Sequence, residues 1–145
     1  MAFTNSLSAA FRPRGAPGRW NSEGVVVVYT AEHAALAALE ILAGWEVYAS
    51  LRGYSLYRCS FSEALLETAP DDLEIDDRVQ TRAHGDAWVH EARSVALRVP
   101  SVVAPESFNV LLNPDHPDFG QVELEPLGPF SFEERIAALV ERAKG

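Results

Sequence analysis

Three side chains in the first third of this sequence have the types and spacing expected of a small-molecule site: Arg19, Tyr29 and Glu40. Arg19 and Tyr29 flank the apolar run Val25 to Val28, and Glu40 is the only charged residue from Ala34 to Trp45. An ionised carboxylate is costly to bury without a partner, so Glu40 must be paired, protonated or turned toward a cleft. At the wall of a cleft it would stabilise a developing positive charge or accept a hydroxyl hydrogen bond.

Each of these residues also has a purely structural interpretation. Glu40 could form an ion pair with Arg52, Arg58 or another arginine, and a loop arginine such as Arg19 is commonly a surface group. An aromatic ring that ends a buried strand, as Tyr29 does, is commonly part of the core, although it could equally stack on a planar ligand ring. None of these residues identifies a site when it is considered alone.

Arginines are concentrated near the N-terminus. Arg12, Arg14 and Arg19 fall within eight positions of a chain that has 12 basic residues and a formal charge of −9. In an acidic protein, a local group of guanidinium side chains suits a phosphorylated small molecule. The alternative is a solvated basic loop.

The composition excludes several classes of function. The strong negative charge argues against nucleic acid, because phosphate backbones bind basic surfaces. Cys59 is the single cysteine, so neither an intramolecular disulfide nor a cysteine-rich metal site is expected. No apolar run approaches the ~20 residues of a membrane span, and the N-terminus lacks the pattern of a signal peptide. We therefore expect a cytoplasmic protein of one domain, residues 1–145.

Common catalytic motifs are missing from the sequence. No Gly-x-Ser-x-Gly elbow surrounds a serine, and there is no glycine-rich phosphate loop. We expect no bound metal, because the histidines lack zinc-ligand spacing: His33, His84, His90 and His116. A metal-dependent hydrolase is therefore the weakest of the enzyme hypotheses. Ser101, after Pro100 at a strand end, is in isolation most simply a residue that satisfies backbone groups.

Hydrophobic patterns predict the elements that position these residues. Met1 to Gly18 indicates an arm and loop, with residues 1–10 the least defined. Val25 to Tyr29 predicts a central strand, covered on both faces. Thr30 is the predicted N-cap of a helix from Ala31 to about Trp45, which is apolar nearly all round and is expected to be buried.

The second half of the sequence alternates between strands and turns. We predict strands at Tyr54 to Phe61, Ser94 to Val99, Phe108 to Leu112 and Val122 to Leu127. Ser62 to Thr68 is predicted to be a helical turn or loop, and the acidic segment Asp71 to Asp77 a solvated loop without chemistry. A capping box at Ser131 to Glu134 predicts a terminal helix that packs through Ile136, Leu139 and Val140. Strands without regular β-α-β alternation favour an α+β fold.

Several short motifs together resemble the RES-domain family, the toxins of bacterial toxin–antitoxin modules with Xre-type antitoxins. The resemblance runs from about Phe11 to Arg135. The matching motifs are Gly18-Arg19-Trp20-Asn21-Ser22, Val27-Val28-Tyr29-Thr30, Ala37 to Leu42, Gly85-Asp86-Ala87-Trp88, Val99-Pro100-Ser101, Leu112 to Phe119 and Pro129-Phe130-Ser131-Phe132. Two features depart from the family: Pro17 replaces a second glycine, and no opening strand is evident in Met1 to Ala10.

The resemblance implies a fold and a set of catalytic residues. The fold would be similar to that of ADP-ribosyltransferase toxins, with a mixed β-sheet core and flanking helices. The family is named after Arg, Glu and Ser, which correspond to Arg19, Glu40 and Ser101, and Tyr29 matches a further functional tyrosine. Further substrate contacts would come from Arg12, Arg14, Trp20, Asn21 and Asn113.

The resemblance also implies an activity. Members of the family consume NAD, with phosphate or water as acceptor, and at least one line modifies a protein. NAD would be a substrate rather than a tightly bound cofactor. In this reading Arg19, with Arg12 or Arg14, grips the pyrophosphate, Tyr29 stacks on nicotinamide, and Glu40 binds the ribose hydroxyls. Ser101 orients the substrate or Glu40.

The implied partners are a helix-turn-helix antitoxin that blocks the active site and a second copy of the chain in a homodimer. Two alternatives stay open at this point. One is an ADP-ribosyltransferase that modifies a protein target. The other is a catalytically silent module that only binds its antitoxin.

Overall fold

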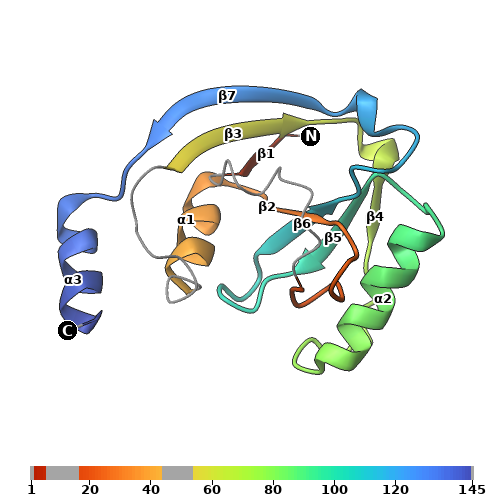
Figure 1. Ribbon diagram of the computed structural model, residues 1–145, viewed down its shortest axis with the longest axis horizontal. Coiled ribbons are helices and arrows are strands. Elements are labelled where there is room, and N and C mark those ends of the chain that lie inside the picture. Colours follow the sequence, from red (N-terminus) through yellow and green to blue (C-terminus); the bar gives the residue numbers. More distant parts are fainter. Residues whose placement is uncertain (1, 6–16, 44–53, 145) are drawn as a thin grey trace.

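The computed structural model describes residues 2–5, 17–43 and 54–144, which form one mixed sheet with helices beside it (Figure 1). The strands are β1 (Ala2–Asn5), β2 (Val28–Ala31), β3 (Tyr54–Ser60), β4 (Leu66–Thr68), β5 (Ala96–Pro100), β6 (Phe108–Leu112) and β7 (Glu123–Phe130). The α-helices are α1 (Ala34–Ala43), α2 (Arg78–His90) and α3 (Glu134–Lys144), and the 3-10 turns are η2 (Glu63–Leu65) and η3 (Phe119–Gln121). The seven strands lie in the order β4-β5-β6-β2-β1-β3-β7.

The pairing of the strands makes the sheet mixed. Strands β4 and β5 run parallel, and each of the other neighbouring pairs is antiparallel. The predicted α+β class with a mixed sheet and flanking helices is confirmed. β2 lies at the centre of the sheet, as predicted, between β6 and β1.

Residues that pair directly across strands share one face of the sheet. Tyr29 pairs with Leu111, and Leu111 pairs with Leu97, so these three side chains lie on the same face. We call it the site face. The next residues along, such as Val28 and Leu112, alternate onto the opposite face, which we call the apolar face.

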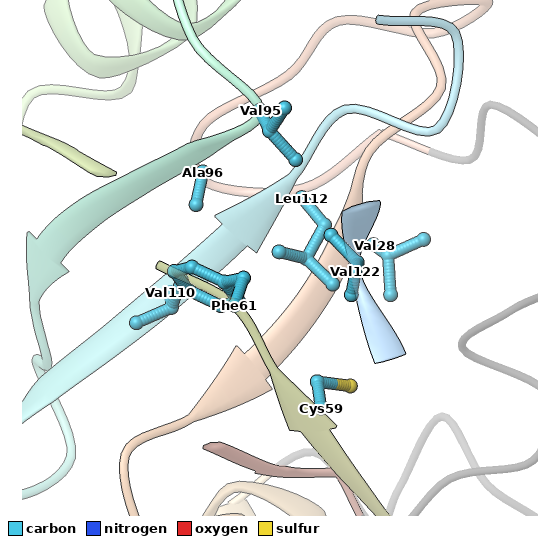
Figure 2. Close-up of a cluster of buried hydrophobic side chains, with 8 residues drawn as sticks. All are labelled: Val28, Cys59, Phe61, Val95, Ala96, Val110, Leu112 and Val122. Carbon is cyan, nitrogen blue, oxygen red and sulfur yellow. The ribbon is translucent and has the colours of Figure 1, made fainter. Parts of the chain in front are cut away.

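The apolar face is covered by β3 and the chain around β7. Figure 2 shows Val28, Val110 and Leu112 close to Cys59, Phe61 and Val122, with Val95 and Ala96 alongside. These side chains are at most 9% exposed. Strands β3 and β7 arch over the central strands in Figure 1, which is how the sheet closes this cluster.

The site face is covered by α2 and by the chain that precedes β2. Its core contains the buried side chains of Trp20, Trp88, Leu97 and Leu111, and we call it the tryptophan cluster. Helix α1 packs farther along the same face, where Leu36 and Ala37 contact Ala31. The two helices therefore flank the part of the site face that lies between them (Figure 1).

Two predictions at the first strand and helix are corrected. The strand begins at Val28 rather than Val25 and continues to Ala31. Thr30 is not an N-cap: it pairs with Val110, and its hydroxyl donates to the Val110 carbonyl oxygen at 2.7 Å. The ladder to β6 outcompetes local capping there. His33 caps α1 instead, since its Nδ1 accepts the Leu36 N–H at 3.2 Å.

The prediction that this helix is buried rather than surface-lying holds for one side of the helix and is wrong for the other. Helix α1 buries Leu36, Ala37 and Ile41, while Leu39 on the opposite side is 45% exposed. One sheet covers one side of a helix, and the apolar sequence alone could not indicate which side. The predicted end at Trp45 lies outside the described residues.

Helix α2 was not predicted, although it is the longest helix described. Its buried side consists of Thr81, Gly85 and Trp88, so it carries no apolar stripe. Asp77 caps it by accepting the N–H groups of Val79 and Gln80. The last residue of the predicted acidic loop, Asp77, is therefore the N-cap of α2.

The two ends of the chain give further corrections. Ala2–Asn5 form β1 between β2 and β3, so the predicted arm contains the strand that was missing from the sequence reading. At the other end, α3 starts at Glu134, later than the capping box at Ser131 predicts, and Glu133 accepts the Arg135 N–H. The predicted packing face is wrong for Ile136 and Leu139, which are 41% and 61% exposed.

The remaining strand predictions are confirmed with small shifts. The strand at 108–112 has the predicted bounds, and those at 54–60 and 96–100 lie within two residues of them. Ser62 to Thr68 forms the turn η2 followed by the short strand β4. The last strand extends to Phe130, because a β-bulge opposite Leu56 and Tyr57 lets its pairing with β3 continue past Leu127.

Candidate active site

The loop that carries Arg19 folds around the hydroxyl of Tyr29. The Trp20 N–H donates to this hydroxyl at 3.1 Å, and the hydroxyl donates to Oδ1 of Asn21. Gly18 lies against the same hydroxyl, so that a Cβ at this position would overlap it. The Gly18 N–H closes the turn onto the Asn21 carbonyl oxygen at 3.0 Å. The glycine before the arginine is thus required by close packing against Tyr29.

Trp20 and Asn21 are buried members of this loop. Their exposed fractions are 3% and 1%, and the Asn21 amide donates to the Val25 carbonyl oxygen at 2.8 Å. Trp20 packs in the tryptophan cluster, with its ring edge-on to His84. In this structure both side chains act within the protein as anchors of the Arg19 loop.

Helix α2 and the segment before it hold the same loop from the other side. The Thr81 hydroxyl donates to the Arg19 carbonyl oxygen at 2.5 Å, and Arg82 Nε donates to the Gly18 carbonyl oxygen at 2.7 Å. Asp86 accepts the Ser22 N–H at 2.9 Å and the Ser22 hydroxyl at 2.5 Å. None of these α2 residues was identified from sequence, although Gly85-Asp86 belongs to a motif that carried the family resemblance.

The Arg19 side chain is half-buried, and within the described residues a backbone carbonyl group holds it. Its Nη1 donates to the Ile75 carbonyl oxygen at 2.7 Å. Ile75 belongs to the acidic segment 71–77, whose sequence predicts a solvated loop without chemistry. A guanidinium group has five N–H donors, so the bond seen within the described residues orients the group and is compatible with bidentate binding of an anion.

Glu40 and Ser101 form the second part of the candidate site. The Ser101 hydroxyl donates to Oε1 of Glu40 at 2.9 Å, across 61 positions of the chain. The same hydroxyl oxygen accepts the N–H groups of Val103 and Ala104 at 3.1 and 3.3 Å, which fixes its direction. Glu40 is half-buried, and Ser101 is 8% exposed. The predicted juxtaposition of Glu40 and Ser101 is thus present.

The ion-pair alternative for Glu40 has no support within the described chain. Arg58 lies on β3 and pairs with Glu125 at 3.5 Å. Arg52, the other arginine considered, lies outside the described residues, as do Arg12 and Arg14, which were predicted to bind substrate. Among the residues described, the hydrogen-bond partner of the Glu40 carboxylate is Ser101.

The two parts lie on the same face of the sheet, the site face. Tyr29 and Ala31 alternate onto this face about 7 Å apart along β2. Ala31 contacts α1, the helix of Glu40, and Ala104, which follows Ser101 in the chain, packs against the same group of side chains. The site face therefore carries both the Arg19 loop with Tyr29 and the Glu40–Ser101 pair.

Asn113 lies far from Ser101 along the β5–β6 ladder. It follows β6 at the end that pairs with Val28, whereas Ser101 extends β5 at the opposite end of the same ladder. With about 3.3 Å per residue, the five residues of β6 separate the two ends by ~16 Å. Asn113 is 1% exposed, and its Oδ1 accepts the Asp115 N–H at 3.1 Å. The structure gives this residue a turn-forming role.

Burial determines the electrostatics of Tyr29. Loss of hydration raises the pKa of Tyr29 to about 12, although the hydrogen bond from the Trp20 N–H and the charges of Arg82 and Arg78 act in the opposite direction. The hydroxyl is therefore un-ionised at neutral pH and can both accept from Trp20 and donate to Asn21. This favours a binding and orienting role over proton abstraction.

Within residues 2–5, 17–43 and 54–144, no three His, Cys, Asp or Glu side chains gather in a way that could hold a metal ion. Over those residues, no helix has the length and apolar character needed to cross a bilayer.

Comparison with known proteins gives consistent results. The RES domain model matches residues 2–133. A "Prs ADP-ribosylating toxin" of Sphingobium sp. (strain YBL2) is 31% identical over 137 residues, covering 82% of this chain and 80% of that protein. A "Toxin Res" of Yersinia enterocolitica is 31% identical over 121 residues, covering 79% of each.

A solved structure supports the fold. The M. tuberculosis MbcT–MbcA toxin–antitoxin complex contains a chain that superimposes with a TM-score of 0.65. The superposition covers 97% of this chain and 86% of that one, at 18% sequence identity. The observed arrangement of the mixed sheet and its helices is therefore shared with a protein of that complex.

Proposed function

Because this chain belongs to the RES domain family, and its relatives above are toxins, we propose that it is an NAD-cleaving toxin of a toxin–antitoxin system. The reaction we assign is cleavage of the bond between nicotinamide and ribose, in the cytoplasm. The acceptor is water or inorganic phosphate. The toxin class follows from the family, whereas the reaction is our proposal: the family resemblance implies it, and the Glu40–Ser101 contact supports it.

The observation that carries the proposed chemistry is the Glu40–Ser101 hydrogen bond on the face of the sheet that also carries Tyr29. Burying a carboxylate on an apolar helix costs free energy unless the group is hydrogen-bonded or paired with a positive charge. Ser101 holds Glu40 Oε1 at 2.9 Å, and two backbone N–H groups hold the Ser101 hydroxyl in turn. Such a chain of contacts preorganises a negative charge, which is the main requirement for stabilising a positively charged transition state.

The proposed reaction moves a positive charge from the nicotinamide ring to the ribose. As the glycosidic C–N bond breaks, its electron pair returns to the ring nitrogen, and nicotinamide leaves as a neutral molecule. The ribose carbon becomes oxocarbenium-like, and the Glu40 carboxylate offsets this charge, an effect of about 3–4 kcal/mol in comparable preorganised sites. Water or phosphate then forms the new C–O bond, and water loses its proton to solvent.

Arg19 and Tyr29 would bind the rest of the substrate. The Arg19 guanidinium, held at Nη1 by Ile75, would grip the pyrophosphate as a bidentate cation. The Tyr29 ring would lie against nicotinamide while its hydroxyl stays engaged with the Arg19 loop. Trp20 and Asn21 would then act indirectly, by fixing that loop.

An antitoxin is the proposed protein partner. The solved complex that shares this fold pairs a toxin with an antitoxin. We expect an Xre-type helix-turn-helix antitoxin to cover the active site of this chain, and we expect the chain to form a homodimer. The chain itself would not bind nucleic acid, because its charge of −9 repels phosphate backbones.

Transfer of ADP-ribose to a protein is the second candidate function. The Sphingobium relative is described as an ADP-ribosylating toxin at 31% identity. The same Glu40-stabilised intermediate would serve this reaction, with a protein side chain in place of water. The two candidates therefore differ only in the acceptor.

Product analysis distinguishes these functions. Purified protein would be incubated with NAD in phosphate-free buffer, with phosphate, and with a bacterial lysate, using NAD labelled in the adenosine half. ADP-ribose, its 1-phosphate or a labelled protein band would identify water, phosphate or protein as acceptor. Absence of nicotinamide release in all three would reject the proposal in favour of a catalytically silent binding module.

The variant Glu40→Gln tests the role of the carboxylate. We expect kcat to fall about 100- to 1,000-fold, since the charge is lost while size and hydrogen bonding are kept. Glu63→Gln, at an exposed carboxylate of η2, is the matched control and should retain activity. An unchanged kcat in folded Glu40→Gln would contradict the assignment.

A further inference from the structure

We propose that α2 is the positioning element of Arg19, and that Thr81, Arg82 and Asp86 set the affinity for substrate without touching it. This inference rests on the proposed function, because it assumes that Arg19 grips the pyrophosphate. It concerns a helix that carries none of the residues expected to contact substrate. Its basis is a set of hydrogen bonds that all end on one short loop.

The first observation is that two consecutive carbonyl groups are held. The Gly18 carbonyl oxygen accepts from Arg82 Nε at 2.7 Å, and the Arg19 carbonyl oxygen accepts from the Thr81 hydroxyl at 2.5 Å. Fixing the peptide groups on both sides of the Arg19 Cα fixes the direction in which its side chain leaves the backbone. A loop held by one hydrogen bond could rotate about that bond, and the second hydrogen bond opposes this rotation.

The second observation is that the loop is held beyond Arg19 as well. Asp86 binds Ser22 through both carboxylate oxygens, at 2.9 and 2.5 Å. Between these anchors, Gly85 lies so close to Trp20 that a Cβ would overlap the Trp20 carbonyl oxygen. Positions 81, 82, 85 and 86 share one side of a helix, so a single rigid element holds the whole loop.

The third observation concerns the side chain of Arg19 itself. Its Nη1 donates to the Ile75 carbonyl oxygen at 2.7 Å, and Ile75 lies just before the Asp77 cap of α2. The segment that orients the guanidinium is thereby fixed to the helix that orients the backbone. Preorganisation of this kind lowers the entropy that substrate binding must overcome.

Thr81 offers the cleanest test, because it is uncharged and fully buried. Thr81→Val removes the hydroxyl and keeps the shape, and Thr81→Ser keeps the hydroxyl. The matched control is Thr30→Val. Thr30 is also a buried threonine that donates to a backbone carbonyl oxygen, at 2.7 Å, but its side chain lies on the apolar face.

We expect Thr81→Val to raise the KM for NAD about tenfold while kcat stays within about threefold, which is the scale of one lost hydrogen bond. Thr81→Ser should restore KM, and Thr30→Val should leave it unchanged. In an Arg19→Lys background the effect of Thr81→Val should shrink, because Thr81 acts through Arg19. An unchanged KM in folded Thr81→Val, or an equal rise in Thr30→Val, would overturn the proposal.

Amide hydrogen exchange separates this inference from the proposed function. Thr81→Val should speed exchange of the Trp20 and Ser22 N–H groups relative to Thr30→Val, whether or not NAD is consumed. Unchanged exchange would show that α2 does not hold the loop. If the wild-type protein released no nicotinamide but exchange responded as expected, the proposed function would fail while the structural hold of α2 on the loop remained.

Discussion

The two faces of the central strands are built from alternating residues of one sequence, yet they hold their surroundings differently. On the apolar face, Val28 and Leu112 meet Cys59 in contacts without hydrogen-bonding groups. On the site face, Tyr29 and Trp20 combine apolar packing with a network of hydrogen bonds. Packing attraction is non-directional, whereas hydrogen bonds fix angles as well as distances.

This difference explains why a site forms on one face. A catalytic arrangement has to be held to within a fraction of an ångström, which requires directional contacts. The apolar face contributes mainly to stability. The site face orients the Arg19 loop, and burying the polar groups that do so costs free energy of desolvation. Two neighbouring residues of β2 illustrate this difference. The Tyr29 hydroxyl holds the Arg19 loop on the site face, whereas the Thr30 side chain lies on the apolar face.

The pKa values of two buried groups reflect the same contrast. Burial raises the pKa of Tyr29 and that of Cys59 each to about 12. For Cys59, desolvation is the whole cause. For Tyr29, the Trp20 N–H and the charge of Arg82 oppose desolvation, so a polar environment surrounds this group even though it is buried.

The largest expected effect is on the apolar face. Leu112→Ala removes a fully buried side chain, and we expect the free energy of unfolding to fall by about 2–5 kcal/mol. The KM for NAD of the folded fraction should not change. Denaturant unfolding and steady-state kinetics measure the two quantities. Leu139→Ala, at a 61% exposed leucine, should change stability by no more than about 0.5 kcal/mol.

An intermediate effect is expected on the site face from Gly85→Ala. Helix propensity alone would stabilise α2 by about 1 kcal/mol. A Cβ would nevertheless overlap the Trp20 carbonyl oxygen, so we expect a net loss of about 1–3 kcal/mol together with a raised KM for NAD. Gly120→Ala is the control, because nothing lies within 4 Å of a Cβ there. Stabilisation by Gly85→Ala would indicate that the Arg19 loop is free to move away.

The smallest expected effect comes from Tyr29→Phe. Loss of the hydroxyl leaves the Trp20 N–H without this acceptor and should cost about 1–2 kcal/mol at neutral pH. The folded-state pKa of Tyr29 is raised above its ordinary value of 10, so the contribution of the hydroxyl is complete below pH 10 and is lost as the pH rises toward 12. The free energies of unfolding of the wild-type protein and of Tyr29→Phe, measured at a series of pH values, should therefore converge between pH 10 and pH 12. Titration of Cys59 affects both proteins equally and cancels in their difference. A difference in the free energy of unfolding that stays constant across this pH range would contradict the role assigned to the Tyr29 hydroxyl.

Local sequence patterns predicted those strands whose hydrophobic residues alternate or cluster. The strand at 108–112 was predicted with its observed bounds, because Val110 to Leu112 are apolar and a turn sequence follows at once. Helix α2 was missed because its buried positions are a threonine, a glycine and one tryptophan. The strand Ala2–Asn5 was missed because it is too short to show alternation, and it exists through its pairing with β2 and β3.

The candidate site divides in the same way. Residue types alone marked Arg19 and Glu40 as unusual, and motif resemblance linked them to Ser101. The contact between Glu40 and Ser101 spans 61 positions, so no local pattern could establish it. The roles of Thr81 and Asp86 were invisible for the same reason, since each acts on a loop more than 60 residues earlier in the chain.

The sequence by itself therefore determined the α+β class, most of the strands and the identity of the residues with chemical potential. These depend on hydrophobic periodicity and on residue type, which are local properties. Only the tertiary structure decided which face each residue takes, that Trp20 and Asn21 turn inward, and that α2 holds Arg19. These outcomes depend on long-range pairing of strands, because the partner across the sheet determines which alternate side chains are buried together.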